Sequence, residues 1–289
     1  PVSTLEHEPN DTKESSNPIR AGILINGDSK EDEDWFKIHV PQSNVPSVMD
    51  IILFSEDNFA SSKFSVYSAL PFAMIGESDK PHLTIGVIGE SDYYIHVPAG
   101  LRQYSLVATI SNLKRGYIWE IENNNSVDRA NTINLDDSIA NFEVIGNTDS
   151  VDWFKVHISE SSKKSLMNIY LYSETARMQI FSSQRESDQI GEISVSNGSF
   201  TSIIKSGSDY FIKLFAQETS KIYQFFVNIT EVPTGQDLAF EVEPNDYPVL
   251  ANNLEIGTKK RGTSWDKDKD IDYYKIFIQK DGILNVQFS

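Results

Sequence analysis

Two glutamates separated by a single residue, Glu6 and Glu8, begin a cluster of oxygen donors near the start of the sequence. In an extended segment alternate side chains share a face and lie about 6 to 7 Å apart, so both carboxylates can reach one site. Asn10 and Asp11 follow Pro9 in a short turn and add an amide oxygen and a third carboxylate. Calcium takes about six to eight oxygen ligands and tolerates irregular geometry, so this donor set predicts a calcium site.

The cluster occurs three times along the chain, at a period of about 118 residues. An acidic stretch before an aromatic segment follows each copy, and we expect it to supply further ligands. Three ordered copies favour a cation site over the alternative, in which these acidic groups are only solvated turn and capping residues. The predicted ligands are Glu6, Glu8, Asn10, Asp11, Glu31 and Asp34; Glu120, Glu122, Asn124, Asn125, Asp149 and Asp152; and Glu241, Glu243, Asn245, Asp246, Asp270 and Asp272.

The three copies differ in ways that predict unequal sites. The second has Asn123 in place of proline and Asn125 in place of aspartate, so it has one negative ligand fewer and is expected to bind calcium more weakly. In the third, Lys269 falls where the first aspartate of the downstream pair is expected. Asp268 or Asp270 must replace it there, or that site is incomplete.

The segments that position these residues alternate apolar and polar side chains, as in Phe36, Ile38 and Val40, which is the period of a strand with one buried face. Short runs of this kind, separated by Gly, Asn, Ser and Asp, predict an all-β fold of tandem antiparallel β-sandwich modules, jelly-roll-like, two complete and a third partial. The expected modules are residues 1–117, 118–235 and 236–289. At about 118 residues each can bury its own core, which favours separate modules with linkers near residues 114–119 and 232–240 over a solenoid.

The repeated blocks resemble the bacterial pre-peptidase C-terminal domain family. The resemblance rests on Glu-x-Glu-Pro-Asn-Asp at Glu6, on Asp-Trp-Phe-Lys-Ile at Asp34 and on Asp-Tyr-Tyr-Ile-His at Asp92, with their later copies, and it covers nearly the whole chain. It implies a secreted or cell-surface β-sandwich of the kind appended to extracellular peptidases. Similar modules of bacterial collagenases bind collagen and calcium, with ligands from the leading block and from an Asp-x-x-Asp, which here is Asp149 to Asp152.

Composition limits the classes of function. The chain has 289 residues, 42 acidic and 25 basic side chains and a formal charge of −17, which disfavours nucleic acid as a partner. It has no cysteine and no apolar run long enough to span a membrane, so we expect no disulfide, no thiolate metal site and no membrane insertion. No nucleophile elbow, phosphate loop or zinc-protease spacing is present, and we predict that the chain is not an enzyme.

Two functional hypotheses follow. In the first, the chain is a secreted or cell-surface, calcium-stabilised array that acts as a non-catalytic binding, adhesion and spacer segment. Its partners would be an extracellular protein or polysaccharide, or neighbouring subunits, and repetition would serve reach and avidity. In the second, it is the accessory substrate-binding region of a larger extracellular peptidase or other hydrolase. Either places it outside the cell or on its surface, with a signal peptide beyond this sequence.

Overall fold

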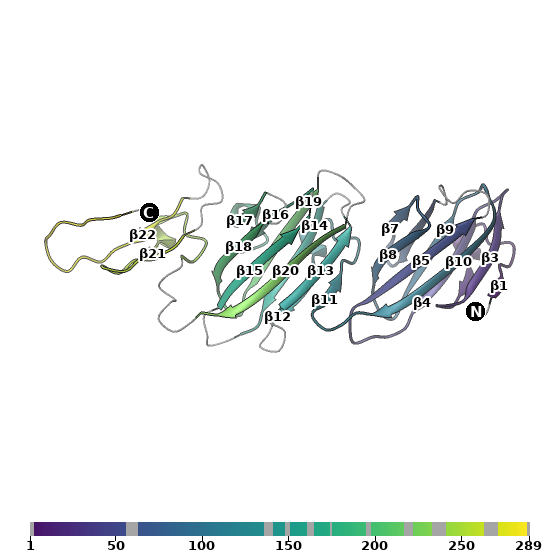
Figure 1. Cartoon of the computed structure of the whole chain (residues 1–289), viewed down its shortest axis with the longest axis horizontal. Helices are drawn as coiled ribbons and strands as arrows, with labels where there is room; N and C mark the ends of the chain where they lie inside the picture. The colour runs from purple at the N-terminus through teal and green to yellow at the C-terminus, as the bar shows by residue number, and fades with distance from the viewer. Residues whose placement is uncertain are drawn as a thin grey trace.

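The computed structural model describes residues 3–55, 63–135, 141–147, 151–160, 165–173, 175–194, 198–216, 222–232, 241–262 and 271–287. Within these residues the regular structure consists of strands and of four single-turn 3-10 helices, with no α-helix, which confirms the predicted all-β class. Three repeats follow one another along the long axis, with strands β1–β10, β11–β20 and β21–β22 (Figure 1).

Repeat 1 contains two five-stranded sheets, ordered β1-β3-β10-β5-β8 and β2-β4-β9-β6-β7. Their inward side chains form one core, in which Phe36, Ile38 and Val40 are fully buried, as their alternation predicted. The elements are β1 (Ser3–Leu5), η1 (Lys13–Ser15), β2 (Asn17–Ile19), β3 (Leu24–Ser29), β4 (Asp34–Val40), β5 (Ser47–Ser55), β6 (Phe64–Ala69), β7 (Phe72–Ser78), β8 (His82–Val87), β9 (Ser91–Val97) and β10 (Leu101–Asn112).

Repeat 2 has the same strand order, β11-β13-β20-β15-β18 and β12-β14-β19-β16-β17, around a second core. Of repeat 3 the described residues form only a short two-stranded sheet. The elements are β11 (Tyr117–Trp119), η2 (Val127–Arg129), β12 (Asn131–Leu135), β13 (Asn141–Asn147), β14 (Val151–Ile158), β15 (Ser165–Tyr172), β16 (Ala176–Phe181), η3 (Glu186–Asp188), β17 (Gln189–Ile193), β18 (Ser199–Ile204), β19 (Asp209–Ala216), β20 (Ile222–Glu231), η4 (Pro248–Leu250), β21 (Asn252–Asn253) and β22 (Tyr274–Lys275).

The prediction of tandem antiparallel, jelly-roll-like β-sandwich modules was wrong: the repeats form a β-solenoid of stacked coils. The sheets are not purely antiparallel: the opening strands of each repeat pair in parallel, β1 with β3, β2 with β4, β11 with β13, β12 with β14 and β21 with β22. Local alternation of side chains predicts a strand but not the direction of its partner, which is why the sequence did not show this pairing.

Consecutive repeats also lie directly against one another. Strand β11, in the first predicted linker, pairs within repeat 2 and contacts β5 and β8 of repeat 1. The carbonyl oxygen of Glu120 comes so near Gly86 that a Cβ atom on Gly86 would lie 2.1 Å from it. A parallel bridge joins Ile203 of repeat 2 to Val242 of repeat 3. Such direct stacking is a property of solenoids rather than of separated modules. Most of the second predicted linker, residues 233–240, lies outside the described residues.

Candidate metal centres

Backbone hydrogen bonds bring the Glu-x-Glu segment of repeat 1 beside the start of β4. The Glu6 amide donates to the Asn26 carbonyl at 3.0 Å, which continues the pairing of β1 with β3. The Trp35 amide donates to the Asn10 carbonyl at 2.9 Å, so Asp34 is held next to the loop. The corresponding bonds recur at Trp153 to Asn124, 3.0 Å, and Tyr273 to Asn245, 3.1 Å. The sequence repeat is therefore also a repeat of local geometry.

An asparagine clamps each loop ten residues after the residue between the two glutamates. Asn17 Oδ1 accepts from the His7 amide at 2.6 Å and its Nδ2 donates to the His7 carbonyl at 2.7 Å. Asn131 makes the same two bonds to Ile121, and Asn252 makes them to Val242. The sequence reasoning missed these clamps, although their constant spacing from the glutamates was a signal that could have revealed them.

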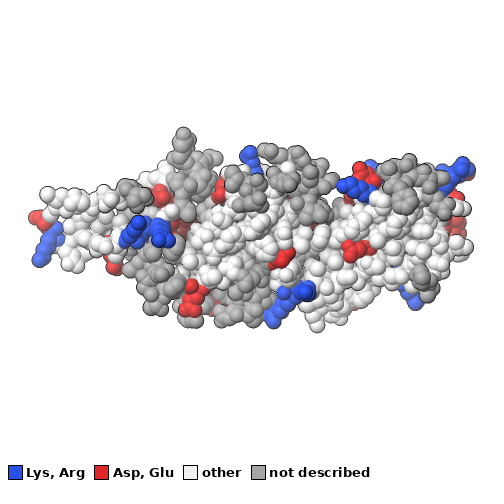
Figure 2. Space-filling model, viewed as in Figure 1, with Lys and Arg blue, Asp and Glu red and all other residues white. Residues whose placement is uncertain are grey.

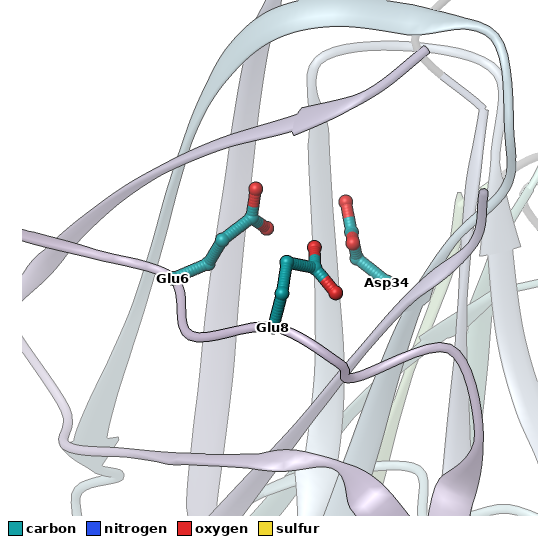
Figure 3. A group of neighbouring side chains, drawn as sticks. All are labelled: Glu6, Glu8 and Asp34. Carbon is teal, nitrogen blue, oxygen red and sulfur yellow. The ribbon is translucent and has the colours of Figure 1, made fainter. Parts of the chain in front are cut away.

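The carboxylates predicted to converge do so in all three repeats. Ligand atoms of Glu6, Glu8 and Asp34 all lie within 4.8 Å of one another, and in Figure 3 the three carboxylates point toward a common centre. The same grouping is formed by Glu120, Glu122 and Asp152, and by Glu241, Glu243 and Asp272. A further group in repeat 1, Glu8, Asp11 and Asp32, adjoins the first by sharing Glu8.

Not every predicted ligand joins its cluster. Glu31 is not part of the acidic group of repeat 1 and pairs with Lys30 at 3.4 Å on the surface. Its neighbour Asp32 instead groups with Glu8 and Asp11. Asn125 is exposed, and Asp246 Oδ1 accepts a hydrogen bond from the Ile271 amide at 3.3 Å. Asp149 and Asp270, with Asp268 and Lys269, lie outside the described residues.

A buried asparagine completes each cluster. As placed, the Asn10 side-chain oxygen lies 3.2 Å from a carboxylate oxygen of Glu8 and 3.0 Å from Asp34 Oδ1, so oxygen faces oxygen unless the amide is turned to donate. Asn124 is fully buried, and neither its Oδ1 nor its Nδ2 has a hydrogen-bond partner among the described residues. A buried amide without a partner destabilises a protein by about 1–3 kcal/mol. A cation between these oxygens would give the side-chain oxygens of Asn10 and Asn124 a partner.

A tyrosine from the C-terminal part of the repeat sequence contacts two carboxylates through its hydroxyl group. The Tyr104 hydroxyl lies 2.8 Å from Glu6 Oε2 and 2.7 Å from Asp34 Oδ2 but has one hydrogen to donate. Burial raises the pKa of Asp34 to about 7, although the Tyr104 hydrogen bond lowers it; the nearby charges of Glu6 and Glu8 raise it as well. Without a cation, the cluster therefore favours a proton on Asp34 near neutral pH.

Repeats 2 and 3 also place a tyrosine hydroxyl at the acidic centre, but in repeat 3 it comes from a different strand. In repeat 2 the fully buried Tyr223 hydroxyl bonds to Glu120, and burial followed by the charges of Glu120 and Asp152 raises the tyrosine pKa. In repeat 3 the hydroxyl comes from Tyr274, which donates to Glu241 at 2.7 Å. The segments that begin at Tyr104 and Tyr223 are similar in sequence. Because they lie far from the glutamates along the chain, the sequence did not predict that these tyrosines contact them.

A glycine makes room for the first glutamate in each repeat. A Cβ atom on Gly27 would lie 2.4 Å from both Glu6 Oε2 and the Tyr104 ring. On Gly146 it would lie 2.3 Å from Glu120 Oε2, and on Gly262 it would lie 2.4 Å from Glu241 Oε2. Real Cβ atoms do not approach so closely, so these three positions require glycine if the glutamate is to reach the centre. The sequence reasoning missed them too.

The three centres differ in exposure. Glu120 and Asp152 are 3% and 1% exposed, and Glu241 and Glu243 are 4% and 7% exposed, whereas Glu6 and Glu8 are more open to solvent. Beside the first centre lies a cleft of about 720 Å³ lined by both of its glutamates and by Tyr104. A hydrated ion can therefore reach the centre of repeat 1 directly.

No protein-family model and no curated protein matches the chain. Solved structures that are similar to it include the periplasmic g-type lysozyme inhibitor PliG of Aeromonas hydrophila, with a TM-score of 0.28, 14% identity and coverage of 35% of this chain and 97% of that one. The CUB1-EGF-CUB2 domain of human MASP-1/3 has a TM-score of 0.25 and 9% identity, and covers 70% of this chain and 94% of that one. Likenesses this weak carry no argument about fold or function, and the resemblance to the pre-peptidase C-terminal family stays a prediction.

The described residues contain no helix that is long and apolar enough to cross a membrane.

Proposed function

We propose that each repeat binds calcium at its Glu-x-Glu cluster and that the chain is a calcium-stabilised, non-catalytic binding and spacer segment of an extracellular or cell-surface protein. The observation that carries the proposal is the convergence of three carboxylates and a buried asparagine at the same place in three repeats. The oxygen donors suit a hard cation, and we favour calcium over magnesium because calcium accepts more ligands and tolerates irregular geometry.

Electrostatics supports the cation. In repeat 1 no described lysine, arginine or histidine forms an ion pair with Glu6, Glu8 or Asp34, and Asp34 is fully buried. Like charges placed together in a buried site repel and favour protonation, unless an opposite charge is bound there. A divalent ion would relieve that repulsion and would accept the asparagine oxygen as a ligand.

The position of the clusters supports a structural role. Glu120 follows β11 directly, where repeat 2 packs on Gly86 of repeat 1, and Glu241 and Glu243 flank Val242, which bridges to repeat 2. An ion at either place would fix the start of one repeat against the end of the previous one. Because the repeats follow one another in line (Figure 1), fixed junctions would keep the array extended.

An aromatic face on repeat 1 supports the binding part of the proposal. Trp35 stacks on His96 with ring centroids 4.5 Å apart, Tyr67 stacks on Phe72 at 5.1 Å, and Phe72 is 45% exposed. In repeat 2 the rings of Trp153, Phe181 and Phe211 are buried and pack against Val127 and Ala130. Exposed aromatic side chains contribute strongly to binding at protein interfaces, so this face suits an extracellular protein or polysaccharide partner.

The extracellular location belongs to the same proposal. Extracellular calcium modules bind with dissociation constants of about 0.1 to 1 mM, a range that an open, partly solvated centre such as that of repeat 1 suits. On the face in Figure 2 the described basic side chains are scattered and form no continuous patch, so nothing there favours a nucleic-acid partner.

Calorimetric melting after treatment with a chelator, and again after adding calcium or magnesium, tests the metal. We expect calcium to raise the melting temperature of the metal-free protein and magnesium to raise it less, since an ion that binds only the folded state stabilises it. Glu6→Gln with Glu8→Gln should remove the contribution of repeat 1, whereas the exposed Glu14→Gln should not. Equal melting curves with and without calcium would refute the proposal.

A further inference from the structure

A cleft of about 660 Å³ lies at the junction of repeats 1 and 2, apart from the acidic centre of repeat 1. One wall is formed by the β6–β7 turn and the β8–β9 turn of repeat 1, and the other by the start of repeat 2, including η2. This volume is within the usual range for sites that bind small ligands or chain ends.

The wall from repeat 1 carries exposed apolar side chains that are not buried in the core of the repeat. Leu70 is 94% exposed and Ile88 is 53% exposed, and both line the cleft together with Pro71. The amide of Ile88 bonds to Tyr93 as the amide of Lys205 bonds to Tyr210, so repeat 2 places a lysine at the same position. The fold therefore accepts a charged side chain at the position of Ile88, so the isoleucine in repeat 1 needs another explanation.

The wall from repeat 2 supplies a positive charge. Arg129, the last residue of η2, is exposed and forms no ion pair with any residue that the structure describes. A guanidinium group binds a carboxylate through two parallel hydrogen bonds, and this geometry is specific for a planar anion. Of the other acidic groups that line the cleft, Asp92 is paired with Lys37 and His39, and Glu122 belongs to the acidic centre of repeat 2. Glu90 is exposed and adds negative charge at the rim.

We propose that this cleft binds the carboxy-terminal end of a peptide, with the terminal carboxylate on Arg129 and an apolar last side chain against Leu70 and Ile88. Glu90 favours a basic residue further up the same peptide. A sugar is a poorer fit, since the exposed wall offers branched aliphatic side chains rather than a flat aromatic ring. The contacts with Arg129, Leu70 and Ile88 do not use the proposed calcium ligands.

Titration of the full chain with acetyl-Lys-Ala-Leu, followed by calorimetry and by shifts of the leucine and isoleucine methyl signals, tests the site. We expect the free acid to bind with a dissociation constant of about 1 mM or tighter, and its carboxamide to bind at least about tenfold more weakly. Arg129→Gln should weaken the acid at least about tenfold and remove the difference between acid and amide. Leu70→Ser should weaken both forms.

Arg20→Gln is the matched control, because Arg20 is also exposed in repeat 1 and does not line the cleft. It should leave both affinities unchanged, and melting curves would confirm that each variant is folded. Equal affinity for acid and amide, or an Arg129→Gln variant that binds like the wild type, would overturn the proposal. A free branched-chain acid, 4-methylpentanoate, that binds as tightly as the peptide would overturn the assignment to a peptide end.

Discussion

Replacing Asp34 with asparagine is expected to stabilise the metal-free protein and to destabilise the calcium-bound one. Asparagine has nearly the shape of a protonated aspartate, so it can still accept the Tyr104 hydrogen bond and can donate toward Glu6 or Glu8. It carries no charge at any pH. The substitution therefore removes the electrostatic repulsion of the cluster and, with it, one calcium ligand.

The magnitude follows from the pKa of Asp34, which burial raises from 3.8 to about 7. A shift of about three units corresponds to about 4 kcal/mol, because each unit contributes about 1.4 kcal/mol. Since the folded pKa is above the unfolded one, the folded state holds the extra proton between pH 4 and 7. The metal-free wild type therefore loses stability as pH rises through this window, by up to about 4 kcal/mol.

Urea unfolding of both proteins at pH 4 and pH 8, with a chelator and then with calcium, measures this difference. In chelator at pH 8 the Asp34→Asn protein should be more stable by several kcal/mol, about 10 °C in melting temperature, and at pH 4 the two should agree. In calcium the order should reverse. Asp79→Asn, at an exposed turn, is the control. A gap that is the same at both pH values, or a calcium stabilisation of Asp34→Asn as large as that of the wild type, would show that the reasoning is wrong.

Other substitutions test the neighbouring contacts. Gly146→Ala should destabilise repeat 2 by about 1–3 kcal/mol and remove its calcium response in a melting assay, since the new Cβ would overlap Glu120. Tyr104→Phe should lower the metal-free stability in urea by about 1–2 kcal/mol, because it removes the donor to two carboxylates. Asp92→Asn should lower the free energy of unfolding by under about 1 kcal/mol. Hydrogen bonds from Lys37 and then His39 lower the pKa of Asp92, so this last loss should be seen in urea at pH 7 and disappear as pH falls below about 4.

The sequence predicted the strands well because alternation of side chains is a local property. Phe36, Ile38 and Val40 on β4 and Phe154 and Val156 on β14 are all fully buried, as their spacing required. The stacking of repeats was not predictable in this way, because it depends on contacts between surfaces, such as the approach of Glu120 to Gly86. A unit long enough to bury its own core can still pack on its neighbours.

The candidate site was predictable in its carboxylates and not in its surroundings. The Glu-x-Glu spacing and the aspartate before the aromatic strand were sufficient to find the three acidic groups, since both lie in short segments with regular backbone. Glu31 was predicted as a ligand, but it pairs with Lys30, whereas its neighbour Asp32 groups with Glu8 and Asp11, because adjacent loop residues can turn either way. Gly27 and Tyr104 were missed because they approach Glu6 from segments about 20 and 100 residues away.

The three centres share the same acidic groups but differ in the residue that donates the tyrosine hydrogen bond. The hydroxyl comes from β10 and β20 in repeats 1 and 2 but from Tyr274 of β22 in repeat 3, at the position that Phe36 and Phe154 occupy in the other repeats. A donor to the first glutamate is therefore present in each case, although it comes from different places in the fold. The glutamate pair, the buried asparagine and the aspartate keep their places throughout. A group of acceptors that is retained while its donor changes is better explained by a bound cation than by the hydrogen bond to tyrosine, which satisfies only some of the oxygens.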